Sequence, residues 1–325
     1  MSALKRKVRW GTISAMFVLI AGCQNVESTG VSLQALDRDS ANAAIPARDF
    51  APQISPNGMQ LVYYSYRAER TPDIYVFDLN TFEERRLTAT PKVWEIEPDW
   101  FGGNEVISFP AGNSMRELQT HLMNVSDGEV TKYGQQRDNI GPANPLADGS
   151  GFVTFLKKSD VEYQLAIFDD GPHLAIVSIE LPPGKSASPK PSPDGRYILF
   201  HVTHQQRRDL YVADLEDGDL WRITDNEIEE EYLNWSQDGN WVLYSANSGE
   251  QPRRIYGIRI DADARVAGKP VQLTHGPSDQ AHVFSSMSAD GEWLYFDANL
   301  SRDSRIFRQS MRNLDQPPEQ LTGVK

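Results

Sequence analysis

The segment "SPDGRYILF", residues 192–200, decides the fold. Proline fixes φ at the second position of a tight turn, Asp suits the third, and Gly195 adopts a left-handed conformation without steric cost. The Tyr, Ile, Leu and Phe residues that follow favour a β-strand. Nearly the same text recurs as "SPNGMQLVYY" from residue 55, "SQDGNWVLY" from 236 and "SADGEWLYF" from 288. One copy predicts only a β-hairpin, whereas four copies indicate a repeat.

The turns recur at a nearly constant distance. Their last residues are Gly58, Asn104, Gly149, Gly195, Gly239 and Gly291, which gives intervals of 46, 45, 46, 44 and 52 residues. We expect Asn104 to take the left-handed conformation, which asparagine tolerates best after glycine. Each unit adds a strand with an aromatic residue, such as "DIYVFDL" from 73, and most add a short strand that ends in Leu-Thr or Ile-Thr. Each unit therefore contains four short strands.

Four antiparallel strands with a period of 40 to 50 residues are typical of a β-propeller blade. The sequence predicts an all-β fold, a six-bladed β-propeller of four-stranded antiparallel blades, over residues 48–325. The turn joins the innermost and second strands of each blade, and the recurrent aromatic residues pack between blades. The first and sixth units own four strands each, so the ring closes without exchanging a strand. Alternatively, residues 31–47 supply an outer strand.

The N-terminus carries a separate signal. Lys5, Arg6, Lys7 and Arg9 precede a short apolar stretch that ends in "LIAGC", residues 19–23. This pattern resembles the lipobox of bacterial lipoproteins. The resemblance implies a signal peptide over residues 1–22 and a diacylglycerol with palmitate-type acyl chains on Cys23, the one cysteine of the chain. Residues 23–47 follow as lipidated cysteine and flexible tether. Gln24 stands where enteric inner-membrane lipoproteins have Asp, which favours the outer membrane, facing the periplasm.

The acidic charge balance argues against nucleic acid as a partner. The net charge is −13 and hydrophobic residues make up 39% of the chain. A nucleic-acid binder needs a basic face, so the composition argues against that class. We expect a monomeric protein with no cofactor beyond the lipid.

The pattern of turn, "DIYVFDL"-like strand and "RxLT" ending resembles the propeller repeat of TolB, the periplasmic component of the Tol–Pal envelope system. The resemblance covers about 85% of the chain and is weakest around Asn104 and Gly149. The same repeat occurs in the propellers of prolyl-oligopeptidase-type peptidases and in oligogalacturonate lyase, so it implies a fold more than a function. TolB itself has an α/β domain before its propeller, and the predicted tether is too short to hold one.

Catalytic patterns are sparse. A peptidase needs a nucleophile elbow and a hydrolase domain, and neither is present in the sequence. The resemblance to oligogalacturonate lyase implies a metal held by His and Gln, for which Gln280 and His282 are the candidates. His201 is predicted to end a second strand and His204 to lie in the loop after it, both elsewhere on a blade. An enzyme of the lyase type is therefore one alternative, and a glycan or small-ligand sensor is another.

Acidic residues are predicted to gather where loops enter the innermost strands. "EIEPDW" from 95 and "EIEEEY" from 227 precede two of these strands, and such loops converge on one mouth of the channel. We predict a non-catalytic propeller that binds an envelope protein or peptide at this mouth. The candidate residues there are Glu97, Asp99, Glu230, Glu231, Asp279 and His282.

Overall fold

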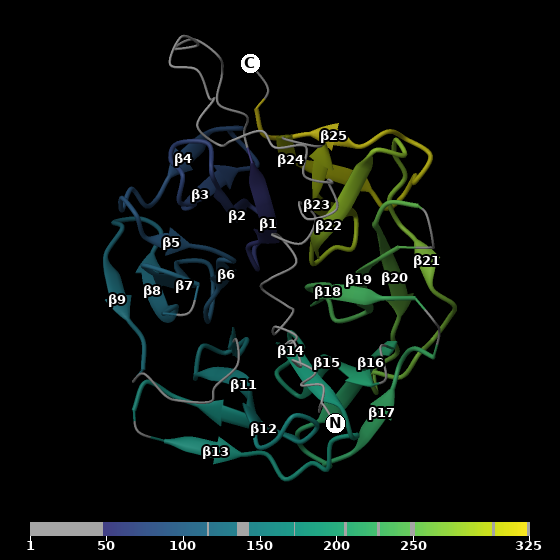
Figure 1. The fold of residues 1–325 in the computed structure, drawn as a ribbon. Helices are drawn as coiled ribbons and strands as arrows, with labels where there is room; N and C mark the ends of the chain where they lie inside the picture. Colours follow the sequence, from purple (N-terminus) through teal and green to yellow (C-terminus); the bar gives the residue numbers. More distant parts are fainter. Residues whose placement is uncertain are drawn as a thin grey trace, which may run out of the picture. The chain divides into compact units, whose positions relative to one another are not determined.

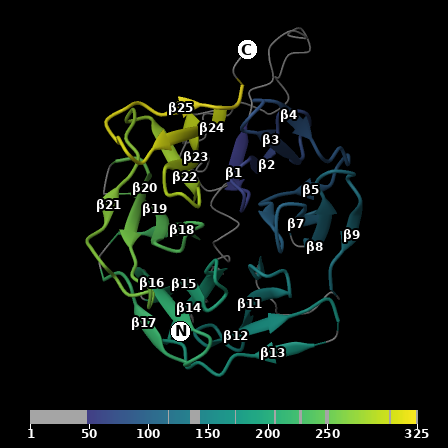
Figure 2. The ribbon, with the colours of Figure 1, turned by 180° about the vertical axis from the view of Figure 1, so that it is seen from behind.

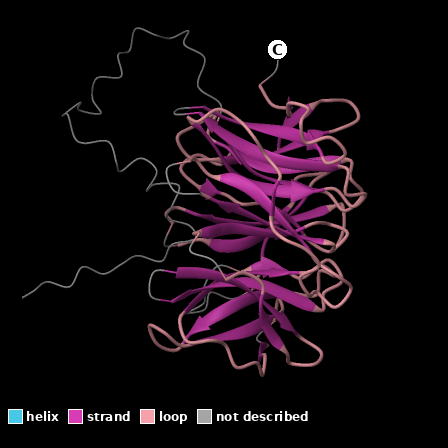
Figure 3. Ribbon diagram, turned by 90° about the vertical axis from the view of Figure 1, so that its right-hand side faces the viewer, coloured by secondary structure: helices cyan, strands magenta, loops and turns pink. Residues whose placement is uncertain are grey.

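The computed structural model describes residues 48–115, 117–134, 143–171, 173–204, 207–225, 228–247, 251–300 and 303–323. By its internal contacts the chain divides between residues 44 and 45, and all described residues belong to the second part. The predicted signal peptide, Cys23 and the tether therefore lie outside the described residues. Within the described ranges the regular structure is β-strand alone (Figure 3), and no helix is long and apolar enough to cross a membrane.

Six antiparallel sheets surround a central axis (Figure 1), and the view from behind shows the same ring (Figure 2). The first blade contains β1 (Asp49–Ile54), β2 (Gln60–Ser65), β3 (Asp73–Asp78) and β4 (Glu84–Arg86). The second contains β5 (Trp94–Glu95), β6 (Asp99–Trp100), β7 (Val106–Gly112), β8 (Gln119–Asn124) and β9 (Val130–Lys132). The third contains β10 (Asn144–Pro145), β11 (Phe152–Lys157), β12 (Tyr163–Phe168) and β13 (Leu174–Ile176).

The fourth blade contains β14 (Lys185–Pro191), β15 (Tyr197–His204), β16 (Arg207–Asp214) and β17 (Leu220–Arg222). The fifth contains β18 (Glu230–Trp235), β19 (Trp241–Ala246), β20 (Arg254–Arg259) and β21 (Val271–Gln272), and the sixth contains β22 (Gln280–Met287), β23 (Trp293–Leu300), β24 (Asp303–Ser310) and β25 (Glu319–Gln320). The predicted six-bladed fold is confirmed. In the second blade the innermost strand is split into β5 and β6, both paired with β7.

The turn that defines the repeat is built by its serine. In the fourth blade Ser192 Oγ donates to Asp194 and accepts from the backbone N–H of Tyr197 at 2.9 Å, while Gly195 N–H donates to the Ser192 carbonyl. Gly195 has φ 77°, a region in which only glycine is free of strain. The same bonds recur around Ser55, Ser236 and Ser288.

The second blade departs from this pattern. The prediction that Asn104 takes the left-handed conformation was wrong, because Gly102 (φ 66°) and Gly103 (φ 148°) take the positive φ values. Asn104 instead joins two blades, since its Oδ1 accepts from the backbone N–H of Asn57 at 2.8 Å. Because the two preceding glycines supply the positive φ values of this turn, Asn104 does not need to adopt one.

The apolar core lies between blades, as predicted. One cluster joins the fourth and fifth blades, and another joins the first and sixth through Ile54, Tyr63 and Tyr295. Within blades, an aromatic residue of the second strand stacks on one of the third: Tyr63 on Tyr75, Phe200 on Tyr211, Tyr244 on Tyr256 and Phe296 on Phe307. Each stacked pair adds about 0.5–1.5 kcal/mol beyond burial. The recurrent aromatics are therefore structural.

The Leu/Ile-Thr ending ties the fourth blade to the fifth and the sixth blade to the first. Thr224 Oγ1 accepts from the backbone N–H of Leu210 at 2.9 Å and donates to Glu230, which begins the fifth blade. At the ring closure, Thr322 Oγ1 accepts from Ile306 N–H at 3.0 Å and donates to Asp49 Oδ2 at 2.6 Å. One threonine thus joins two blades in each case.

The ring closes without a shared strand, because the first and sixth sheets are each complete from their own four strands. Polar contacts hold the seam: Ser304 Oγ donates to the Asp49 carbonyl at 2.8 Å, and Ile54 N–H donates to Ser286 Oγ at 3.2 Å. The alternative outer strand from residues 31–47 lies outside the described residues.

Candidate channel-mouth site

The innermost strands carry a bulge at one repeated position. Ala51, Glu97, Ser188 and Tyr232 each lie seven residues before the end of the turn, and each has φ between 46° and 56°. A bulge re-aims side chains and bends the strand. Because these strands line the axis, the repeated bulge forms one level of the channel wall, with Phe284 at the corresponding place in the sixth blade.

A second level lies two residues further along each innermost strand. There Lys190 Nζ of the fourth blade lies 3.5 Å from Asp99 Oδ2 of the second, and Asn234 Nδ2 of the fifth donates to Gln53 Oε1 of the first at 3.0 Å. These contacts join blades that are not neighbours in the ring. The channel is therefore narrow at this level, which we call the waist (Gln53, Asp99, Lys190 and Asn234).

Glu97 lies on the entry side of the waist. Its side chain is half-buried, and burial raises the pKa of its carboxyl while Lys190 lowers it. Among the described residues it has no hydrogen-bond or ion-pair partner within normal distance. Its charge contributes to the raised pKa values of Tyr64, Tyr66 and Tyr232, whose first cause is burial. Glu97 is thus a carboxylate among tyrosines. We call this the mouth cluster: Tyr64, Tyr66, Glu97 and Tyr232.

Aromatic packing holds the mouth cluster. Tyr66 makes edge contacts with Phe50, Tyr64 and Trp94, at ring-centroid distances of 6.1 Å in each case. On the other side Tyr232 contacts Phe284 at 4.5 Å. The wall around Glu97 is therefore rigid and rich in π-electrons, a combination that favours a cation.

Asp297 lies behind the mouth cluster on β23. It is fully buried and accepts from the backbone N–H of Phe284 at 2.9 Å and from that of Ala51. Burial raises the pKa of this carboxyl to about 7. Asp297 therefore supports the bulges of two blades at the ring seam.

The remaining predicted mouth residues differ in their surroundings. Glu230 is buried and accepts from Thr224, and Glu231 is buried between Arg208 and Arg253. Both lie within β18 rather than in a loop before it. The Thr224 hydroxyl hydrogen-bonds Glu230, and two guanidinium groups neutralise the carboxylate of Glu231. Asp279 is exposed in the loop before β22, and Asp99 belongs to the waist.

His282 and Gln280 lie together on β22, with Nε2 of the histidine 3.5 Å from Oε1 of the glutamine. His282 is only 1% exposed, and burial together with Arg254 and His275 lowers its pKa to about 3. Over the described ranges, no three His, Cys, Asp or Glu residues lie together in a way that could hold a metal ion. His201 lies within β15 and His204 ends that strand, so the predicted strand end at His201 was wrong.

Sequence reasoning missed the tyrosines, Lys190, Asn234 and Asp297. The repeat itself indicates these residues. Residues seven and five positions before the end of the turn face the axis, and Asp297 and Tyr64 both lie six positions after the end of the turn. Superposing the repeats position by position, rather than searching for charge runs, would have grouped them.

Comparisons with known proteins agree with this architecture. No family model matches the chain. It is 26% identical over 148 residues to the uncharacterized peptidase YuxL of Bacillus subtilis, of which it spans 22%, and 22% identical over 255 residues to the uncharacterized protein Atu1656 of Agrobacterium fabrum, covering 72% of this chain and 78% of that one.

Solved structures extend the comparison. A putative TolB from Agrobacterium tumefaciens matches at TM-score 0.59 and 19% identity, covering 77% of this chain and 87% of that one. The propeller domain of the Trilobed protease from Pyrococcus furiosus, which has an open velcro topology, matches at 0.54 and 14%, covering 84% and 81%. An oligogalacturonate lyase from Vibrio parahaemolyticus matches at 0.55 and 15%, covering 85% and 78%. These likenesses show the fold: the described residues form a TolB-like six-bladed β-propeller.

Proposed function

We propose that this chain is a non-catalytic lipoprotein of the bacterial cell envelope whose propeller binds a cationic segment of a protein or peptide at the mouth cluster. Acyl chains on Cys23 anchor it to the outer membrane, facing the periplasm, and two or three such chains are enough for stable anchoring. The ligand of the propeller is then a periplasmic partner rather than a nucleic acid.

The observation that carries the proposal is Glu97. Lys190 acts on Glu97 through its charge but pairs with Asp99, so Glu97 is a half-buried carboxylate without an ion pair of its own among the described residues. Such a carboxylate is costly, and a lysine or arginine side chain from a partner would relieve that cost. The partly exposed Tyr66 ring adds cation–π attraction, whereas Tyr64 is fully buried and the Arg253 guanidinium already lies 5.8 Å from the Tyr232 ring centroid. The waist stops a chain from threading through, so a partner inserts a side chain or a chain end from the entry side.

The test is a binding titration with two synthetic peptides, one a glycine-rich chain bearing lysines and the other its glutamate counterpart. We expect the lysine peptide to bind and the glutamate peptide not to bind. Glu97→Gln should weaken the lysine peptide about tenfold or more, because a charge-assisted hydrogen bond contributes roughly 1.5–3 kcal/mol.

The control variant is Glu105→Gln, which removes the same charge from an exposed position in the second blade at the turn end. It should bind the lysine peptide as the unaltered protein does. Equal binding of both peptides, or equal weakening by the two substitutions, would refute a specific role for the mouth cluster.

A further inference from the structure

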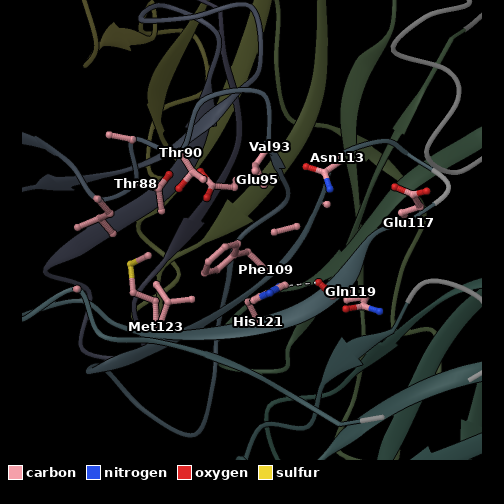
Figure 4. Close-up of a pocket in the computed structure, with 16 residues that line it drawn as sticks. Thr88, Thr90, Val93, Glu95, Phe109, Asn113, Glu117, Gln119, His121 and Met123 are labelled. Atoms are coloured by element: carbon pink, nitrogen blue, oxygen red, sulfur yellow. Dashed lines mark hydrogen bonds between the residues drawn. The ribbon is translucent and has the colours of Figure 1, made fainter. Parts of the chain in front are cut away.

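A pocket of about 780 Å³ lies between the first and second blades, separate from the mouth cluster. Its size is within the range of sites that hold small organic ligands. One wall comes from the segment after β4, and the other comes from β7 and β8 (Figure 4). The connections that border it leave the blades at the same end as the channel entry, so the pocket belongs to the same face of the ring but not to the axis.

Glu95 gives the pocket its chemistry. It is 4% exposed, and its Oε2 has no hydrogen-bond partner in the described part of the chain. Burial raises the pKa of this carboxyl, and the Thr88 and Thr90 hydroxyls and the Arg86 guanidinium act against that rise. Arg86 is already paired with Glu69 and Asp73, so Oε2 is left without a cation of its own. Figure 4 shows Glu95 on one wall with Thr88 and Thr90.

The repeat supplies an internal comparison. Asp49 and Glu230 occupy the position of Glu95 in the first and fifth blades, nine residues before the turn end. Asp49 accepts from Thr322, Ser65 and Arg67, and Glu230 accepts from Thr224. Among these three described residues, Glu95 alone has a buried oxygen left unpaired, and it lines the pocket. Thr88 acts on Glu95 as Thr224 acts on Glu230, so the shared structural role accounts for that contact but not for the unpaired Oε2.

The opposite wall carries an acceptor and an aromatic ring. His121 Nδ1 lies 2.9 Å from the Gln119 carbonyl, which can only accept, so Nδ1 carries the proton and Nε2 is an acceptor in the neutral ring. The Phe109 ring lies beneath His121, with centroids 5.9 Å apart. Two acceptors and an aromatic floor suit a ligand that donates hydrogen bonds and carries positive charge.

We propose that this inter-blade pocket binds a small organic ammonium ion, with Glu95 as its counter-ion and His121 Nε2 as a second acceptor. The pocket is independent of the mouth cluster. Loss of one site leaves the other intact.

The test uses benzylammonium chloride and its neutral analogue benzyl alcohol on protein labelled with ¹³C in its methionine methyl groups. Met123 lines the pocket and is 1% exposed, so its methyl signal reports occupancy. We expect benzylammonium to shift the Met123 signal in a saturable way, with the other methionine signals unmoved. Benzyl alcohol should give no saturable shift.

Four variants decide the assignment. Glu95→Gln should weaken binding at least about tenfold, which corresponds to about 1.4 kcal/mol. Glu129→Gln, exposed in the same blade, and Glu97→Gln at the mouth cluster should leave it unchanged. Asn113→Trp fills the exposed rim while keeping Glu95 and its threonine partners, and it should abolish the shift even if Glu95→Gln perturbs the blade.

Other outcomes would overturn the proposal. An equal Met123 shift with benzyl alcohol would make the pocket an apolar cavity, and an unmoved Met123 signal would mean that benzylammonium does not enter. Equal weakening by Glu95→Gln and Glu129→Gln would reduce the effect to general electrostatics.

Discussion

Thr322→Val isolates the bond that closes the ring. Valine keeps the shape of threonine and removes the hydroxyl that accepts from Ile306 N–H and donates to Asp49. The buried Ile306 N–H left without an acceptor costs about 1 kcal/mol. The lost hydrogen bond to Asp49 costs about 1 kcal/mol as well, and no more, because Asp49 keeps Ser65 and Arg67 as donors. We expect a loss of about 2 kcal/mol in the free energy of unfolding, measured by urea titration.

Thr224→Val is the matched control, because it removes the same pair of bonds between the fourth and fifth blades. The chain itself joins those two blades, whereas the first and sixth blades meet without a covalent link or a shared strand. Amide hydrogen exchange in β1 and β24 should therefore accelerate in Thr322→Val and not in Thr224→Val. A stability change below about 0.5 kcal/mol, or equal exchange in the two variants, would refute this account of closure.

Three further predictions concern single residues. Burial raises the pKa of Asp297 from 3.8 to about 7, so between these pH values the folded state keeps a proton that the unfolded state loses, and the free energy of unfolding falls as the pH rises. Asp297→Asn should flatten this pH dependence in urea titrations at several pH values. An unchanged slope of stability against pH would contradict the prediction. Gly195→Ala meets no atom within 4 Å, so its expected loss of about 1–2 kcal/mol in unfolding free energy reflects only its φ of 77°; a neutral substitution would show that the turn relaxes. Cys23→Ser should abolish incorporation of radiolabelled palmitate and release the protein from the membrane fraction, and retained label would exclude Cys23 as the lipidation site.

Fold and site differ in how far the sequence predicts them. Turn spacing predicts six blades because, in four of the turns, the serine, the Asp or Asn and the glycine bond within the turn itself. The same holds for ring closure, since each terminal unit carries its own four strands. Local chemistry decides these features, so local sequence reveals them.

The polar sites depend on contacts between distant blades. Glu230 and Glu97 both stand in acidic runs, yet the Thr224 hydroxyl donates a hydrogen bond to Glu230, whereas Glu97 has no hydrogen bond or ion pair among the described residues. A bulge at Tyr232 re-aims the strand, so alternation alone misplaces its neighbours. The contact of Asp99 with Lys190 crosses the axis, and no sequence period reports which blades face each other.

The most direct test of the central claim is photo-crosslinking in living cells, with the photoreactive amino acid in place of Glu97 in one strain and of Arg207, exposed on the fourth blade, in another. The account predicts a discrete covalent adduct from position 97 that is absent from position 207. No adduct from position 97, or the same adduct from both positions, would contradict binding at the channel mouth.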